Sequence, residues 1–205
     1  MQKPPSNSHL IFDNADCFAE TFTNLTMPGF KLKKAEFEAC NFINCDFNEA
    51  FFHSCRFVDC TFDNCNLSLM KLTNSKFSNT KFISSKILSV DWTMCDWNSL
   101  LNAEPLRFRD SLLQDNYFFG LKLEGLECIE CRLSDVDFQS ASLQRANFSG
   151  SDLKGALFLN THLEEANFTE TQNVNIDIRK NHLEGATFSR FEALYLLESM
   201  GINLV

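Results

Sequence analysis

Residues 146–160 read Ala146-Asn147-Phe148-Ser149-Gly150, Ser151-Asp152-Leu153-Lys154-Gly155, Ala156-Leu157-Phe158-Leu159-Asn160. Each group of five begins with a small residue and carries a large apolar residue at its third position. Neither regular element has this period, because helices place apolar residues at i, i+3, i+4 and i+7 whereas strands alternate them. Two inward-facing residues in every five instead suit a chain that turns a corner after each short extended step.

The same period extends through most of the chain, from Phe12 to Phe188, with nearly every fifth residue large and apolar. Four such steps close a square coil of about twenty residues, and stacked coils pair their backbones at the ordinary strand spacing of about 4.8 Å. An internal repeat of this kind decides the architecture before any other argument. We therefore predict an all-β solenoid with four sides.

Phe and Leu alternate along the second half of the chain, so a four-step coil sorts them into separate columns. One column contains Phe108, Cys128, Phe148, Phe168 and Phe188, and the opposite column contains Phe118, Phe138 and Phe158. The columns between them are Leu113, Leu133 and Leu153 on one side and Leu123, Leu143, Leu163 and Leu183 on the other. Such columns fill a narrow bore at native density, which predicts a solid core without a pocket.

The chain divides into three parts. Residues 1–11 are expected to form a flexible leader, residues 12–188 the solenoid, and residues 189–205 a C-terminal helix and tail for dimerisation. A register break falls at 98–107, where eleven residues separate Trp97 from Phe108 and ten would keep phase. This spacing predicts one extra residue, held as a bulge or kink, with a tolerated insertion of no role as the alternative.

The C-terminal helix is expected to present one apolar face. Its start is predicted at Ser189, with Glu192 completing a capping box. The face and the tail after it contain Phe191, Leu194, Leu197, Met200, Ile202 and Leu204. The helix and tail therefore contain more apolar surface than is needed to cover the open edge of the last coil. We predict a symmetric homodimer joined through these residues; a helix that only caps a monomer is the alternative.

No residue pattern indicates catalysis or a cofactor. All nine cysteines fall on inward positions of the repeat, which predicts packing rather than disulfides, and the single pair Cys128 and Cys131 is weak as a zinc signal. His162 and His182 lie twenty residues apart, and two histidines without a third ligand at suitable spacing indicate a surface ladder rather than a metal site. A phosphate-binding loop and a catalytic triad are both absent from the sequence. We predict no enzyme, no cofactor and no metal.

No run of about eighteen apolar residues is present, and the first residues lack the apolar segment of a signal peptide. We therefore expect a cytoplasmic protein that does not bind membranes. Its net charge of −9 is uneven, since residues 1–107 carry 12 acidic and 10 basic side chains and residues 108–205 carry 15 and 8.

The acidic side chains of the second half recur in columns. These are Glu124, Glu164 and Glu184 with Glu165 beside them; Asp110, Glu130 and Glu170 with Glu127 nearby; Asp115 with Asp135; and Asp137 with Asp177. A rod with regularly spaced negative charge is similar to duplex DNA, and it would complement a protein with a positively charged DNA-binding saddle. The alternative is that these side chains only keep the rod soluble.

Several segments carry a more specific likeness. They are Asn64-Cys65-Asn66-Leu67-Ser68-Leu69, Val90-Asp91-Trp92-Thr93, Phe118-Phe119-Gly120-Leu121, Ser151-Asp152-Leu153-Lys154-Gly155, Asn175-Ile176-Asp177-Ile178 and residues 193–202. Over most of residues 35–205 the chain resembles the topoisomerase-protecting, Qnr-like branch of the pentapeptide-repeat proteins, and it looks closest to albicidin-resistance members. The resemblance implies a right-handed quadrilateral β-helix with a C-terminal α-helix.

The resemblance also implies a function. Members of this branch are dimers through the C-terminal helix, and they bind DNA gyrase, often topoisomerase IV as well, as mimics of DNA. They protect the enzyme from drugs that trap the cleaved-DNA complex, without binding nucleic acid themselves. Many Qnr proteins have two loops that project from the rod. The five-residue period of this chain leaves no room for such long loops, and their absence from the pattern favours protection against albicidin-type poisons over protection against fluoroquinolones. A scaffold rod with no topoisomerase role is the alternative function.

Overall fold

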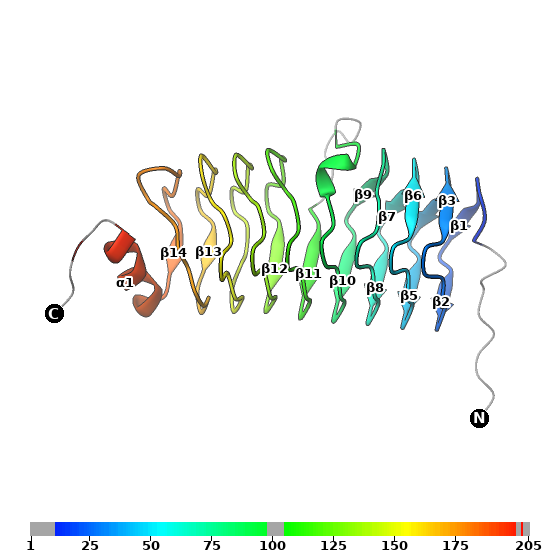
Figure 1. Cartoon of the computed structure of the whole chain (residues 1–205), viewed down its shortest axis with the longest axis horizontal. Helices are drawn as coiled ribbons and strands as arrows, with labels where there is room; N and C mark the ends of the chain where they lie inside the picture. The colour runs from blue at the N-terminus through cyan, green and yellow to red at the C-terminus, as the bar shows by residue number, and fades with distance from the viewer. Residues whose placement is uncertain (1–10, 98–104, 200–201, 203–205) are drawn as a thin grey trace, which may run out of the picture.

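The computed structural model describes residues 11–97, 105–199 and 202 of the 205-residue chain. These residues form an elongated rod of stacked coils, with the earliest coils at one end and a helix at the other (Figure 1). The stacked coils confirm the predicted all-β solenoid. Residues 1–10 of the expected leader lie outside the described residues, and Ile11 is already buried.

Over the described residues the coils contain short strands of two or three residues, one 3₁₀ helix and one α-helix. The strands are β1 (Asp16–Phe18), β2 (Thr21–Thr23), β3 (Lys31–Lys33), β4 (Glu36–Glu38), β5 (Asn41–Ile43), β6 (Phe51–His53), β7 (Arg56–Val58), β8 (Thr61–Asp63), β9 (Lys76–Ser78), β10 (Lys81–Ile83), β11 (Arg107–Arg109), β12 (Glu127–Ile129), β13 (Asn167–Phe168) and β14 (Thr187–Phe188). The helices are η2 (Trp92–Met94) and α1 (Arg190–Ser199).

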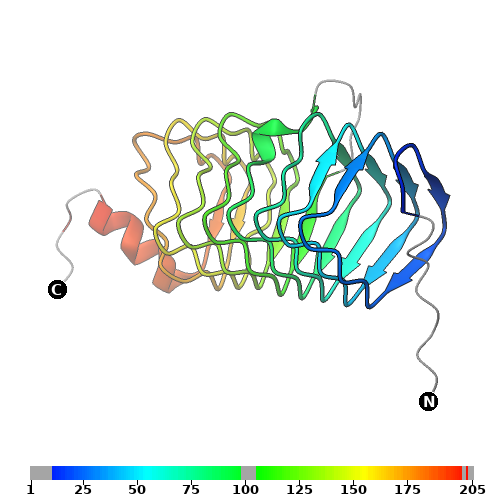
Figure 2. The ribbon, with the colours of Figure 1, turned by 45° about the vertical axis from the view of Figure 1, so that its right-hand side comes forward.

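All strand pairs are parallel and join consecutive coils. The longest sheet runs in the order β12, β11, β10, β8, β5, β2 along one side of the rod. Within it Phe22 pairs with Phe42 and Phe42 with Phe62, always twenty residues apart. Figure 2 shows the same strands lying side by side along the rod axis. This register confirms the predicted coil of four five-residue steps.

A left-handed corner ends most steps, whereas the step of Trp92 ends in the 3₁₀ helix η2. The residue two positions after the large inward residue has a positive φ, as at Asn44 (54°), Leu69 (58°) and Glu165 (60°). Its N–H donates to a carbonyl of the next coil, for example from Asn44 to the Asp63 oxygen at 2.9 Å. Each corner therefore turns the chain and also ties two coils together.

The aromatic columns form as the sequence predicted. Phe148 stacks on Phe168 with ring centroids 5.1 Å apart, and Phe138 stacks on Phe158 at 5.3 Å. The two columns meet across the bore, where Phe138 and Phe148 lie edge to face at 5.5 Å. Edge-to-face and offset-stacked rings are the favoured arrangements of aromatic pairs. The core is therefore a continuous spine of rings.

The spine differs from the predicted pattern at both ends. Phe12 is 56% exposed, and Ile11 closes the core in its place. Near the other end, Ile178 is only half-buried, whereas Val174 and Ile176 are buried. The corner there comes early, at Asn173 with a φ of 56°, and this shifts the inward positions.

The register break is larger than predicted. Phe82 pairs with Phe108, twenty-six residues away, and Trp92 stacks on Phe118 across the same interval. The coil therefore contains six extra residues rather than one. The period could not reveal this, because an insertion of six leaves the same phase as an insertion of one. Residues 98–104 of the predicted break lie outside the described residues.

A buried polar contact joins the two halves of the rod at this coil. Asn116 is fully buried, and its Oδ1 accepts a hydrogen bond from Trp92 Nε1 at 2.9 Å. Its Nδ2 donates to the backbone oxygens of Ile87 and Leu113 at 2.6 and 2.7 Å. Buried amides are tolerated when their hydrogen bonds are satisfied, so the core continues across the insertion.

The nine cysteines are all buried and none is in a disulfide, which confirms the prediction that they pack the core. Burial raises the pKa of Cys60 to about 12 and that of Cys128 well above its usual value. Since the thiolate is the reactive form of cysteine, Cys60 and Cys128 are poor nucleophiles.

Helix α1 follows β14 and lies at the end of the rod (Figure 1). The predicted capping box is wrong: the Ser189 hydroxyl accepts a hydrogen bond from the backbone N–H of Glu170 at 2.8 Å, and Glu192 Oε2 has no partner among the described residues. Leu196 packs against the core. Over the described part of the chain, no helix is both long and apolar enough to span a bilayer.

Replacement of Phe82 by Ala should destabilise the rod strongly. Phe82 is fully buried and stacks between Phe62 at 5.2 Å and Phe108 at 4.9 Å. We expect the free energy of unfolding to fall by about 3–5 kcal/mol, measured by urea denaturation. Phe18→Ala is the matched control, because Phe18 is 67% exposed, and it should change the free energy by less than about 1 kcal/mol. Equal effects of the two changes would contradict the role of the ring column.

Candidate interaction surface

The predicted acidic residues all lie on the outside of the rod, and the printed register aligns three of the four predicted columns. The pairing of Lys122, Ser142, His162 and His182 through successive coils aligns Glu124, Glu164 and Glu184, each two residues further on. Backbone hydrogen bonds align the corners at Asp110, Glu130 and Glu170, and likewise those at Asp115 and Asp135. Asp137 Oδ1 accepts from the Gln139 N–H at 2.9 Å, and Asp177 makes the same contact with Arg179 at 3.0 Å.

These columns are not gathered into one patch. Glu124, Glu164 and Glu184 flank the Leu column that begins at Leu123, and Glu165 occupies the corner after it. Asp115 and Asp135 occupy corners of the column that begins at Leu113, on the opposite side of the coil. Negative charge therefore wraps around the second half of the rod.

Several of the predicted acids are neutralised by neighbours. Glu124 pairs with Arg145 at 3.1 Å, and Glu127 pairs with Arg107 at 3.3 Å. Asp177 is held by Arg179 at 3.0 Å and by Lys180 at 3.6 Å. The Arg179 side chain, as a hydrogen-bond donor and a positive charge, lowers the pKa of the Asp177 carboxyl to about 2. These acids are less available to a partner.

Two acidic columns have no such pairing among the described residues, that of Asp110, Glu130 and Glu170 and that of Asp115 and Asp135. The first is the longer. Asp110, Glu130 and Glu170 are exposed and form no ion pair with any described residue; Gly150 fills the remaining place in the column. Their φ angles of 50°, 55° and 59° hold them at successive left-handed corners. We call Asp110, Glu130 and Glu170 the free acidic ladder. Asp110 and Glu130 lie one coil apart and Glu130 and Glu170 two coils apart, and this row of exposed carboxylates is suited to a positively charged partner.

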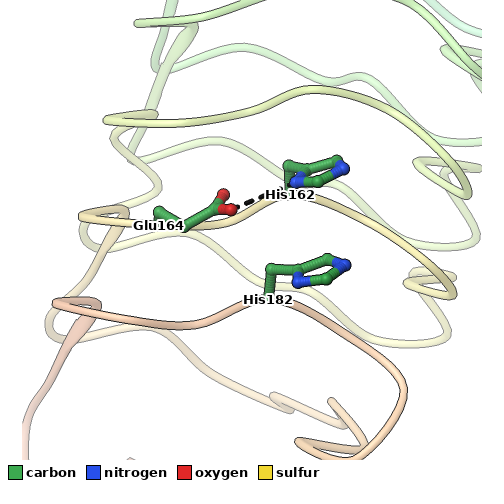
Figure 3. A group of neighbouring side chains, drawn as sticks. All are labelled: His162, Glu164 and His182. Atoms are coloured by element: carbon green, nitrogen blue, oxygen red, sulfur yellow. Dashed lines mark hydrogen bonds and ion pairs between the residues drawn. The ribbon is translucent and has the colours of Figure 1, made fainter.

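The sequence missed a cluster of side chains around Glu164. His162 Nδ1 lies 3.1 Å from Glu164 Oε1, and the His162 ring stacks on that of His182 (Figure 3). Burial tends to raise the pKa of Glu164, but the hydrogen bond with His162 and the nearby histidines outweigh burial and lower it. The available signal was the spacing of two residues between His162 and Glu164, which puts both on the same outer side of one step.

The predicted dimer residues lie on and after α1. Phe191 is 78% exposed, and Leu194, Leu197 and Ile202 are also exposed. Met200 and Leu204 lie outside the described residues. Within the described part of the chain, these side chains of α1 therefore present apolar surface to solvent.

The expectation that the rod has no pocket needs a correction. The cavity at the N-terminal end of the bore holds only about 10 Å³, as a filled core requires. Outside the bore, however, an open groove of about 910 Å³ lies against the first half. Its lining includes Lys31, Lys33, Lys71, Phe51 and Met94. The inward repeat pattern predicts the core, but it does not predict how outward side chains enclose space.

Comparison with known proteins identifies the family. The model of the pentapeptide repeat region matches residues 35–102 and 100–168. Two trypsin-treated variants of QnrB1, a plasmid-mediated fluoroquinolone resistance protein, have similar structures: one is 19% identical with a TM-score of 0.71, covering 93% of this chain and 98% of its own, and the other is 18% identical with a TM-score of 0.69, covering 93% and 100%.

No protein of curated function matches the sequence significantly. At these identities the structural likeness shows the fold alone, whereas the family model covers more than half of the residues. With its five-residue period, left-handed corners and twenty-residue register, this chain belongs to the pentapeptide-repeat family.

Proposed function

We propose that this protein is a DNA mimic that binds DNA gyrase, and topoisomerase IV as a second target, in the bacterial cytoplasm and protects the enzyme from topoisomerase poisons. The free acidic ladder carries the proposal. Asp110, Glu130 and Glu170 are exposed carboxylates without ion pairs among the described residues, set at regular corners of a rigid rod. Such a surface complements a saddle that normally holds the phosphates of duplex DNA.

The overall shape supports the same proposal. About eight coils separate Phe22 from Phe188 in one column, and at about 4.8 Å per coil they span roughly 38 Å. Two rods joined at their C-terminal helices would present about twice this length to the enzyme, with the acidic halves at the centre. The likeness to QnrB1 variants over 93% of the chain is consistent with this use of the fold.

The enzyme assay is the first test. Gyrase supercoiling and DNA cleavage are measured while the protein is titrated, with and without a fluoroquinolone and an albicidin-type poison. We expect supercoiling to be restored at protein concentrations that do not inhibit gyrase alone, and the rescued drug identifies the poison that is countered. Inhibition without rescue would establish a regulator rather than a resistance factor. No effect on gyrase or topoisomerase IV would favour a scaffold rod with no topoisomerase role.

Charge reversal of the free acidic ladder should weaken gyrase binding. The variant carries Asp110→Lys, Glu130→Lys and Glu170→Lys, and lysine tolerates these corners because Lys34 occupies an equivalent one with a φ of 55°. We expect affinity measured by surface plasmon resonance to fall at least about tenfold, because attraction becomes repulsion.

The matched control reverses two acidic corners of the first half, Glu49→Lys and Asp59→Lys, whose φ angles are 57° and 54°. This control should bind gyrase as the wild type does. Unchanged affinity of the ladder variant, with a normal circular dichroism spectrum, would rule out the proposed surface.

The dimer is tested separately in solution. We expect light scattering to give twice the 23.5 kDa mass of one chain. Leu194→Asp should yield a folded monomer, because Leu194 is exposed in the single chain and a charge opposes burial in an apolar interface. The monomer should protect gyrase poorly. A monomeric mass of the wild-type protein in light scattering would count against the dimer and against the proposed length of two joined rods.

A further inference from the structure

Three metal-ligating side chains meet on the outside of two consecutive coils. His162 and His182 are directly paired in the coil register, and their rings stack with centroids 4.4 Å apart and planes 5° from parallel. Glu164 lies beside them, and one donor atom from each of the three residues lies within 4.8 Å of the other two. Figure 3 shows each ring turning one nitrogen toward the Glu164 side.

The cluster contains an unsatisfied oxygen. Glu164 Oε1 contacts His162, but Glu164 Oε2 is enclosed and has no hydrogen-bond partner among the described residues. Gln144 occupies the equivalent position one coil earlier, and its Oε1 is also enclosed without a partner. A buried carboxylate oxygen without a partner is costly, and a cation satisfies such an oxygen directly.

We propose that His162, Glu164 and His182 form a binding site for a divalent transition-metal ion, with Zn²⁺ as the best fit. Two imidazoles and one carboxylate are an established donor set for zinc, which leaves a fourth position for water. Zinc–nitrogen bonds of about 2.0–2.1 Å in a tetrahedral site place the two nitrogens roughly 3.3 Å apart. The donor atoms already lie within 4.8 Å of one another. Because imidazole lone pairs lie in the ring planes and the two rings are stacked nearly parallel, binding one ion requires the rings to turn out of the stack.

The position of the site gives it a structural consequence. His162 and His182 belong to adjacent coils near the C-terminal end, so one ion would cross-link these coils through side chains in addition to the backbone ladder. The site also lies in the column that contains Glu184 and Glu124. A dication bound there reduces the negative charge of this side of the rod, and it does so whether or not the protein binds gyrase.

Calorimetric titration of the untagged protein with Zn²⁺ tests the site. We expect one ion per chain, and no binding of Mg²⁺ at the same concentration, because Mg²⁺ prefers oxygen ligands in octahedral geometry. His182→Ala and Glu164→Gln should each weaken zinc binding at least about tenfold. The matched control is His53→Ala, which removes a histidine from the first half and should leave the affinity unchanged.

Nuclear magnetic resonance of the histidine rings tests the same site in the wild-type protein, without any substitution. Zinc should shift the ring signals of His162 and His182 in the wild type and leave those of His53 in place. Equal shifts of all histidines, no saturable shift up to millimolar zinc, or unaltered zinc affinity of a folded His182→Ala variant would overturn the site.

Discussion

The corner at every fifth residue is the constraint on which the rest of this structure depends. A left-handed φ costs an L-amino acid about 1–2 kcal/mol, yet non-glycine residues such as Leu69 and Glu165 adopt it here. Most corner N–H groups donate to the next coil, for example at 2.8 Å from Leu69 to the Leu88 oxygen and at 2.8 Å from Glu165 to the Glu184 oxygen. Because four corners close one coil, a residue is held directly beside the residue twenty positions later.

Because of this register, residues twenty positions apart in the sequence lie in columns, both inside the core and on the outer surface. Inside, it aligns the Phe rings whose stacking gives the rod a continuous core. Outside, it aligns the free acidic ladder and pairs His162 with His182. A rigid backbone that repeats in this way displays charge at fixed intervals without a deep binding cleft, which is why the proposed function depends on the outer surface. The six extra residues between Trp97 and Phe108 interrupt the period, while Asn116 and Trp92 keep the core joined.

The inward half of each repeat could be predicted in detail, and the outward half could not. The Phe and Leu columns and the burial of all nine cysteines followed from position in the repeat alone. Exposure of Phe12 did not follow from the repeat, since Ile11 occupies the buried position there. The size of the insertion was misjudged because the phase of a five-residue period is the same after one extra residue as after six. The capping box failed because the Ser189 hydroxyl accepts from Glu170 in the preceding coil.

The sequence by itself determined the coil length, the inward residues and the columns in which the acids lie, since these depend only on position within the repeat. Only the tertiary structure decided which acids remain free. Arg145 reaches Glu124 from the next coil, Arg107 reaches Glu127, and no such partner reaches the free acidic ladder among the described residues. It also brought Glu164 to both histidines. The physical reason is that these contacts depend on side-chain rotamers between neighbouring coils, and the period of the sequence does not specify rotamers.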